Sequence, residues 1–158
     1  MKRIGYGQVE PNHLSAQRNG QIYAQLPLAE SLVLENGMFA KYDMAAGNVN
    51  VSGAGEWMLV YNEVKVYDVR ESVKDFVIKG STYPRLFKTN VGDIFTTNTF
   101  AIDEESGEMA DLELGATLVP GSNGYLVAGS TGDMIWKVVK APFTMPDGQP
   151  AVKVQRIK

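Results

Sequence analysis

The sequence of 158 residues contains no cysteine. Disulfide frameworks, zinc sites built on thiolates and cysteine nucleophiles are therefore excluded, because each of them needs a sulfur atom. The absence fits a protein that is made in a reducing cytoplasm. No motif indicates a cofactor, and we expect none.

Histidine is almost absent as well, since His13 is the only one. A serine, histidine and aspartate triad would have to use it, but His13 lies in a polar segment and the sequence has no GxSxG elbow. A metal site built on several histidines is excluded. We expect His13 to form hydrogen bonds at a surface or an interface, and we expect no catalytic residue.

Basic charge and long apolar runs are also lacking. The net charge is −3 and the isoelectric point is near 5.2, whereas binding to nucleic acid requires a basic surface that displaces counterions from phosphates. The first residues lack the apolar run of a secretory signal, and no stretch is long enough to cross a bilayer. The expected partners therefore include neither nucleic acid nor a membrane.

Glycine, by contrast, is frequent, and its 16 residues separate short apolar stretches at the spacing of hairpin loops. In WMLVYNEVKVY, apolar residues at alternate positions predict one long half-buried strand, with Asn62 as the polar exception on its apolar face. DIFTTNTF, DMIWKVVK and AVKVQ predict further strands. One short helix is expected in DVRESVKDFVIK, where Ser72 and Asp75 form a capping pair.

The sequence also resembles itself at an offset of 77 or 78 residues. LENG at 34–37 matches LELG at 112–115, and the carboxylate before WMLV matches the one before MIWKVV. Each copy predicts a three-stranded meander, which hides its apolar face only by packing against another sheet. We therefore predict a mainly all-β fold of small β-sandwich or β-barrel units. The internal similarity indicates two related meanders. The alternative is that the similarity arose by chance, as it can in any glycine-rich β chain.

The expected organisation is an extended N-terminal segment (1–32), a first β unit (33–80) and a second β unit (81–158) that can form one compact domain with the first. Trp57 and Trp136 lie in apolar stretches and are expected in the core rather than as stacking platforms for sugars or bases.

A run of carboxylates offers oxygen ligands of the kind that calcium prefers. Its spacing does not match an EF-hand loop, and we expect solvated charge and no metal site. The residues of this run are Asp103, Glu104, Glu105, Glu108, Asp111 and Glu113.

Four stretches give the chain a recognisable order: GYGQVEPNHLSAQRNGQIYAQLP, LENGMFAKYDMAAGNVNVSGAGEWMLVYNEVKVYD, RLFKTNVGDIFTTNTF and TMPDGQPAVKVQRIK. With them, nearly the whole chain resembles the head decoration or minor capsid proteins of tailed bacteriophages, which are encoded beside the major capsid protein. The resemblance implies a non-enzymatic β protein that binds the outside of the capsid and stabilises the expanded shell. The implied partner is the major capsid protein, and a homo-oligomer of the chain is left open.

Two other functions remain open. One is a tail, baseplate or head-fibre component whose β-domain binds host glycan through Trp57 or a tyrosine. The other is a small hydrolase that uses a dispersed pair of carboxylates, although no pair is singled out by the sequence.

The polar stretch from Val9 to Leu28 has no clear period of helix or strand. We expect it to lie extended on the capsid as a contact arm, with amide hydrogen bonds and a few apolar anchors. The alternative is an N-terminal strand and loop of the chain's own sheets. The expected contact residues are Asn12, His13, Leu14, Gln17, Arg18 and Tyr23.

Overall fold

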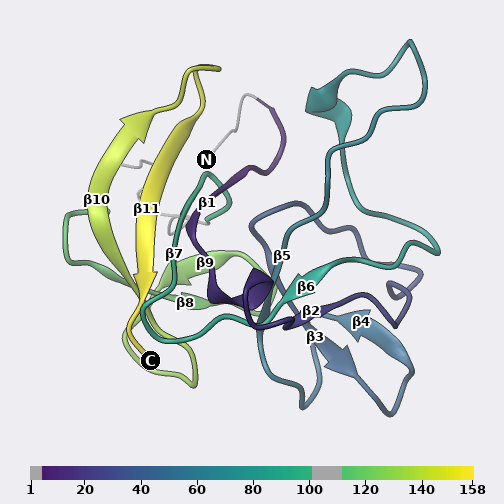
Figure 1. The fold of residues 1–158 in the computed structure, drawn as a ribbon, viewed down its shortest axis with the longest axis horizontal. Coiled ribbons are helices and arrows are strands. Elements are labelled where there is room, and N and C mark those ends of the chain that lie inside the picture. Colours follow the sequence, from purple (N-terminus) through teal and green to yellow (C-terminus); the bar gives the residue numbers. More distant parts are fainter. Residues whose placement is uncertain (1–4, 101–111) are drawn as a thin grey trace.

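The computed structural model describes residues 5–100 and 112–158. These residues form eleven strands in two antiparallel sheets and two single turns of 3-10 helix, and none of them lies in an α-helix (Figure 1). The mainly β fold predicted from the sequence is therefore confirmed. The five-stranded sheet contains β2 (Ile22–Tyr23), β3 (Phe39–Asp43), β4 (Asn48–Asn50), β5 (Met58–Val60) and β6 (Leu86–Phe87). The six-stranded sheet contains β1 (Val9–His13), β7 (Ile94–Thr97), β8 (Thr117–Pro120), β9 (Leu126–Ala128), β10 (Trp136–Thr144) and β11 (Pro150–Arg156).

The strand order repeats along the chain. The five-stranded sheet has the order β2-β6-β5-β3-β4, and the six-stranded sheet has the order β7-β11-β10-β8-β9 with β1 added beside β7. In both units the first strand therefore neighbours the fifth, followed by the fourth, the second and the third. This shared order confirms the two related meanders and extends each of them to five strands.

The hydrogen bonds repeat with the strands. Gly37 N donates to Val60 O at 2.9 Å in the first unit. In the second unit, 78 positions later, Gly115 N donates to Val138 O at 2.8 Å. Both glycines have positive φ values, 91° and 92°, which favour glycine at this turn. The two units thus share a register as well as an order.

The two sheets pack front to back, where the front of each sheet is the face that carries Val60 or its equivalent Val138. The front of the first sheet has a core of its own, formed with loop residues by Ala40, Met58, Val60 and Leu86. The front of the second sheet packs instead on the back of the first sheet. This second core contains Leu118, Trp136, Val138 and Val154 from the front of one sheet and Phe39, Leu59 and Phe87 from the back of the other.

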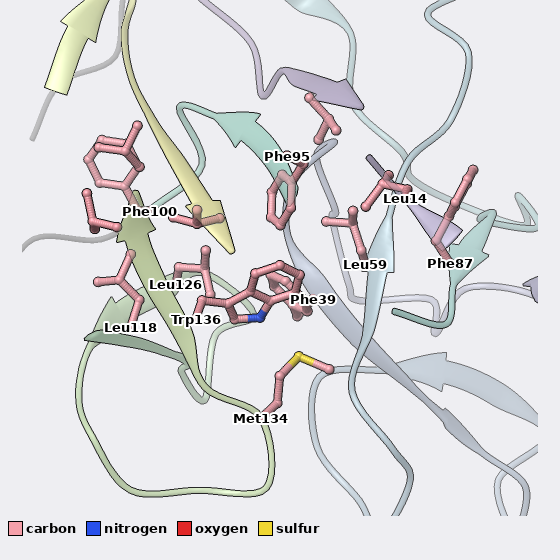
Figure 2. Packing of buried hydrophobic residues seen from close by; sticks show 14 of the residues in the cluster. Leu14, Phe39, Leu59, Phe87, Phe95, Phe100, Leu118, Leu126, Met134 and Trp136 are labelled. Carbon is pink, nitrogen blue, oxygen red and sulfur yellow. The ribbon is translucent and has the colours of Figure 1, made fainter. Parts of the chain in front are cut away.

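Aromatic rings join the sheets in this second core (Figure 2). The ring of Phe39 lies 5.7 Å from that of Trp136, and Phe95 meets Trp136 edge to face at 4.9 Å. Trp136 is fully buried, as the sequence predicts. Trp57, expected in the core, is only partly buried and packs against this core from its edge. Lys41 Nζ lies 4.3 Å from the centroid of its ring.

One predicted strand is much shorter than expected. DIFTTNTF, DMIWKVVK and AVKVQ do contain β7, β10 and β11, but the strand predicted over WMLVYNEVKVY is limited to Met58–Val60. The prediction is wrong for residues 61–67, because the N–H of Asn62 bonds to the side chain of Asn36 at 2.7 Å rather than to a neighbouring strand.

The predicted short helix is a single 3-10 turn, Val73–Asp75, and its capping pair is confirmed. Ser72 Oγ accepts a hydrogen bond from Lys74 N at 3.1 Å, and Asp75 Oδ2 accepts one from Ser72 N at 2.9 Å. A second 3-10 turn, Ser15–Gln17, follows β1.

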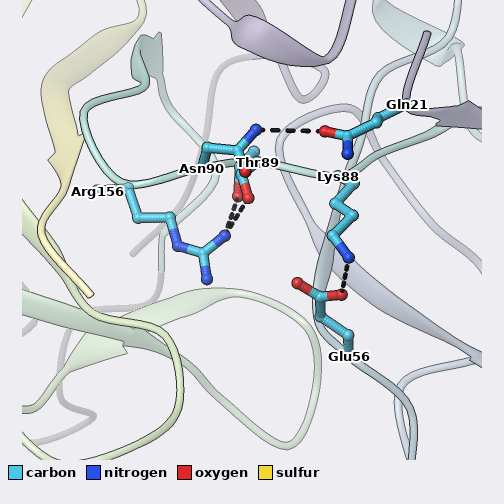
Figure 3. A network of polar contacts seen from close by, with 6 residues as sticks. All are labelled: Gln21, Glu56, Lys88, Thr89, Asn90 and Arg156. Atoms are coloured by element: carbon cyan, nitrogen blue, oxygen red, sulfur yellow. Dashed lines mark hydrogen bonds and ion pairs between the residues drawn. The ribbon is translucent and has the colours of Figure 1, made fainter. Parts of the chain in front are cut away.

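The connection between β6 and β7 is bonded to both units (Figure 3). Asn90 Nδ2 donates to Gln21 Oε1 at 3.3 Å, next to the first strand of the first unit. The guanidinium of Arg156, at the end of the second unit, donates to the backbone oxygen of Thr89 and, at 3.1 Å, to its Oγ1. These contacts hold the point where the chain passes from one sheet to the other.

Between Phe87 and Ile94 the chain therefore passes from the five-stranded sheet to the six-stranded sheet. Segment 1–32 contributes β1 to one sheet and β2 to the other, and β6 of the first sheet lies within the segment 81–158. The division at residues 32 and 80 stays a prediction about domains.

Candidate interaction site

The N-terminal segment belongs to the protein's own sheets. Strand β1 pairs antiparallel with β7, Val9 opposite Thr97 and His13 opposite Ile94. Strand β2 pairs with β6 in the other sheet. For Val9 to Tyr23 the structure therefore shows the alternative reading, a strand and loop of the chain's own fold, and any contact with a partner must come from its outer surface.

Two of the six predicted contact residues are not exposed. Leu14 is only 6 % exposed and belongs to the core between the sheets. Tyr23 is half-buried and packs edge to face on Tyr42 at 5.9 Å. The four that are exposed are Asn12, His13, Gln17 and Arg18.

The polar groups among these residues bond within the chain. Asn12 Oδ1 accepts a hydrogen bond from Thr96 Oγ1 at 2.8 Å, which ties β1 to β7. Arg18 Nη2 lies 3.0 Å from His13 Nε2. Because an arginine can only donate, Nε2 of His13 is the acceptor in this contact. His13 thus forms a surface hydrogen bond with Arg18, five residues later in the same chain.

The segment between β5 and β6 is the most prominent exposed feature. Residues 61–85, which we call the projecting loop, extend away from both sheets (Figure 1). Tyr67 is 88 % exposed and Val69 is 100 % exposed. In the second unit the fourth and fifth strands are joined as a hairpin of β10 and β11. The loop is therefore a departure of the first unit from the repeat.

The base of the projecting loop is firmly held. Ile78 and Leu34 exchange two backbone hydrogen bonds of 2.8 and 2.9 Å, and both side chains are buried in the core on the front of the first sheet. Phe76 packs against the same core. The loop thus combines an anchored base with a tip that exposes Tyr67 and Val69 among charged residues. The sequence did not reveal this loop, because its apolar residues alternate as they would in a strand.

A cavity of about 350 Å³ lies along the loop. Its polar wall includes Glu63 and Lys65, whose side chains form an ion pair at 3.0 Å. The hydrogen bond with the Lys65 ammonium and its charge lower the pKa of Glu63, and Glu63 raises the pKa of Lys65 in return. Glu71, Asp75 and Tyr67 also line the cavity. The lining of the cavity therefore includes both hydrogen-bond acceptors and an aromatic side chain.

Within residues 5–100 and 112–158, no cluster of three or more carboxylate, histidine or cysteine side chains is arranged to hold a metal ion. Most of the acidic run considered as a calcium site, from Asp103 to Asp111, lies outside the described residues. No helix in the described part of the chain is both long enough and apolar enough to cross a membrane.

The geometry thus presents one anchored loop, whose exposed tip carries Tyr67 and Val69 among charged residues, and one N-terminal strand whose residues 10–13 are exposed. Comparison of the chain with protein family models, with curated proteins and with solved structures finds no match.

Proposed function

We propose that the chain is a structural component of a tailed-bacteriophage head, which binds the outer surface of the shell built by the major capsid protein and stabilises the expanded shell. The resemblance along the chain suggests this class of protein. The observation that carries the proposal is the projecting loop, whose exposed tip contains Tyr67 and Val69.

Exposed apolar side chains on a protruding element are typical of surfaces that bind another protein. Val69 has no packing of its own to maintain, since it is fully exposed, whereas Ile78 holds the loop base in the core. The tip can therefore bury apolar surface on a partner without unfolding the protein. A shell presents many copies of one site, so that weak contacts act together.

Binding to isolated, expanded heads that lack the protein tests the proposal. We expect saturable binding of the purified chain and a higher temperature of shell disruption when it is bound. The variant Val69→Asp places a charge in the contact and should weaken binding at least about tenfold, since desolvating it costs more than 1.4 kcal/mol.

Val91→Asp is the matched control, because Val91 is also exposed, at 67 %, but lies in the connection between the two sheets. Its binding to heads should equal that of the unmodified protein. Absence of any binding to heads would contradict the proposed function, and equal weakening by both variants would contradict the role of the loop.

A second function is favoured by the cavity beside Tyr67. Its lining includes the aromatic ring of Tyr67 and the carboxylates of Glu71 and Asp75. Such a combination can stack on a sugar and hydrogen-bond to it. The protein would then be a tail, baseplate or head-fibre component that binds host glycan. Glycan binding that is lost in Tyr67→Ala but kept in Val69→Asp, with the protein located at the tail by electron microscopy, would favour this function over shell binding.

A further inference from the structure

Strand β2 forms one edge of the five-stranded sheet. Gln21 O accepts a hydrogen bond from Lys88 N at 3.0 Å, and in an antiparallel pair the bonded residues alternate with residues that point away. The backbone N–H and C=O of Ile22 therefore point outward from the sheet. Apart from the pairing of β2 with β6, no hydrogen bond to either group is formed by the described residues of the chain.

The second unit shows what such an edge binds. Strand β7 corresponds to β2, and Asp93 O accepts from Arg156 N at 2.9 Å just as Gln21 O accepts from Lys88 N. The outward-facing residues of β7 are Ile94 and Thr96, which pair with β1 opposite His13 and Glu10. The matching positions of the first unit, 72 residues earlier, are 22 and 24.

The two edges also differ in how they are protected. The edge of the six-stranded sheet ends in β1, which contains Pro11 and an irregular register between Glu10 and His13. A proline and a bulge both disfavour the addition of another strand. The edge at β2 has neither. Its Ala24 N–H bonds instead to the neighbouring Gln25 Oε1 at 3.1 Å, a local contact on the surface that a strand can replace.

We infer that the edge of β2 is a strand-addition site, which takes an extended antiparallel segment of a partner polypeptide in the place that β1 occupies on β7. The partner strand bonds to the outward groups of Ile22 and Ala24, and its specificity comes from side chains beside the sheet. The identification of the source as an extended segment of the shell protein rests on the proposed function, whereas the site itself rests on the internal repeat.

The probe is a synthetic peptide with the sequence of residues 5–15, GYGQVEPNHLS, which contains the strand that the equivalent edge binds. It is titrated into the isotopically labelled full-length protein and followed by NMR. We expect saturable shifts of the Ile22 and Ala24 amides and none with a scrambled peptide. Shifts at Ile94 and Thr96, which show exchange of β1 itself, or no shifts at all, would overturn the inference.

Two variants sharpen the test. Ala24→Pro removes an N–H that is not used in the pairing of β2 with β6, and it should abolish peptide binding while the sheet remains folded. Gln25→Ala frees the Ala24 N–H from its side-chain acceptor and should tighten binding up to about fivefold, the worth of one neutral hydrogen bond. Unchanged binding in Gln25→Ala together with unchanged binding in a folded Ala24→Pro would overturn the site. If Ala24→Pro does not fold, unchanged or weaker binding in Gln25→Ala overturns it alone.

Binding of the same variants to heads separates this inference from the proposed function. If Ala24→Pro loses the peptide but binds heads normally, the strand-addition site stands and the shell protein is ruled out as its source. If the unmodified protein binds the peptide but no heads, the proposed function fails while the site is retained. Loss of both peptide and heads in Ala24→Pro, with both retained in Val91→Asp, supports the complete inference.

Discussion

Asn36 and Asn62 are joined by two reciprocal hydrogen bonds. Asn36 Nδ2 donates to Asn62 O at 2.9 Å, and Asn62 N donates to Asn36 Oδ1 at 2.7 Å. The side-chain amide of a buried residue thus satisfies the backbone groups that a neighbouring strand would otherwise satisfy. In addition, Asn62 Oδ1 accepts from Arg85 N at 2.8 Å, where the chain returns from the projecting loop. The two asparagines therefore define where β5 ends and the loop begins.

Replacing Asn36 with alanine should be costly. Asn36→Ala leaves the N–H and C=O of Asn62 without their partners, and we expect the free energy of unfolding to fall by about 3 kcal/mol. Leu114 occupies the matching position of the second unit and is 68 % exposed. Leu114→Ala should therefore change the free energy of unfolding by less than about 0.5 kcal/mol. Chemical denaturation of both variants measures the difference, and equal effects would contradict the role of the amide pair.

Gly37 and Gly115 have the same backbone conformation but different surroundings. A Cβ on Gly37 would lie 2.4 Å from Thr97 Oγ1, whereas the nearest atom to a Cβ on Gly115 is Lys137 Cε at 3.8 Å. Gly115→Ala should therefore cost only the strain of a positive φ, about 1 kcal/mol, and Gly37→Ala about 3 kcal/mol, because steric overlap is added. Thermal unfolding provides the comparison. A larger loss in Gly115→Ala would show that the front-to-back packing is described incorrectly.

Phe39 and Thr117 test the packing of the sheets more directly. Both are the first residues of equivalent strands, but Phe39 is fully buried between the sheets and Thr117 is half-buried on the outer back of the second sheet. We expect Phe39→Ala to lower the free energy of unfolding by about 4 kcal/mol and Thr117→Ala by less than about 1 kcal/mol. Similar losses in urea unfolding would be incompatible with one shared core.

Asp147 should make the protein sensitive to acid. Partial burial acts to raise its pKa, but hydrogen bonds from the side chain and backbone of Gln149 and from the side chain of Gln8 outweigh burial and lower the pKa. A lowered pKa means that the stabilising contribution is complete above the ordinary value of 3.8 and is lost as the pH falls through the lower, folded-state value.

Asp147→Asn should therefore lose less stability than the unmodified protein when the pH is lowered from about 5 to about 3. Asp133→Asn removes the same charge from another exposed position and controls for the change in net charge. Stability curves against pH that coincide for the two variants would show that the Asp147 contacts contribute nothing.

Local patterns predicted much of this fold. Aromatic and β-branched residues indicated β7, β10 and β11. The offset between LENG and LELG located two equivalent turns, because the same glycine conformation is needed at Gly37 and Gly115. The capping pair of Ser72 and Asp75 was also predictable, since it depends on residues three positions apart.

Long-range pairing was not predictable in this way. Residues 61–67 have the alternation of a strand, but Asn36 ends the pairing from 26 positions away. The segment around His13 has no period, yet it is a strand because Ile94 and its neighbours offer an edge. Of the expected contact residues, Leu14 directly follows this strand and is buried in the core between the sheets.

The anchoring of the projecting loop at Asn62 and Ile78 has a practical consequence. Because these contacts hold both ends of the loop, we expect the strands to keep their register when the length or sequence between the two contacts changes. The tip near Val69 is therefore a natural grafting point, at which a foreign epitope could be displayed on a scaffold that keeps its own structure.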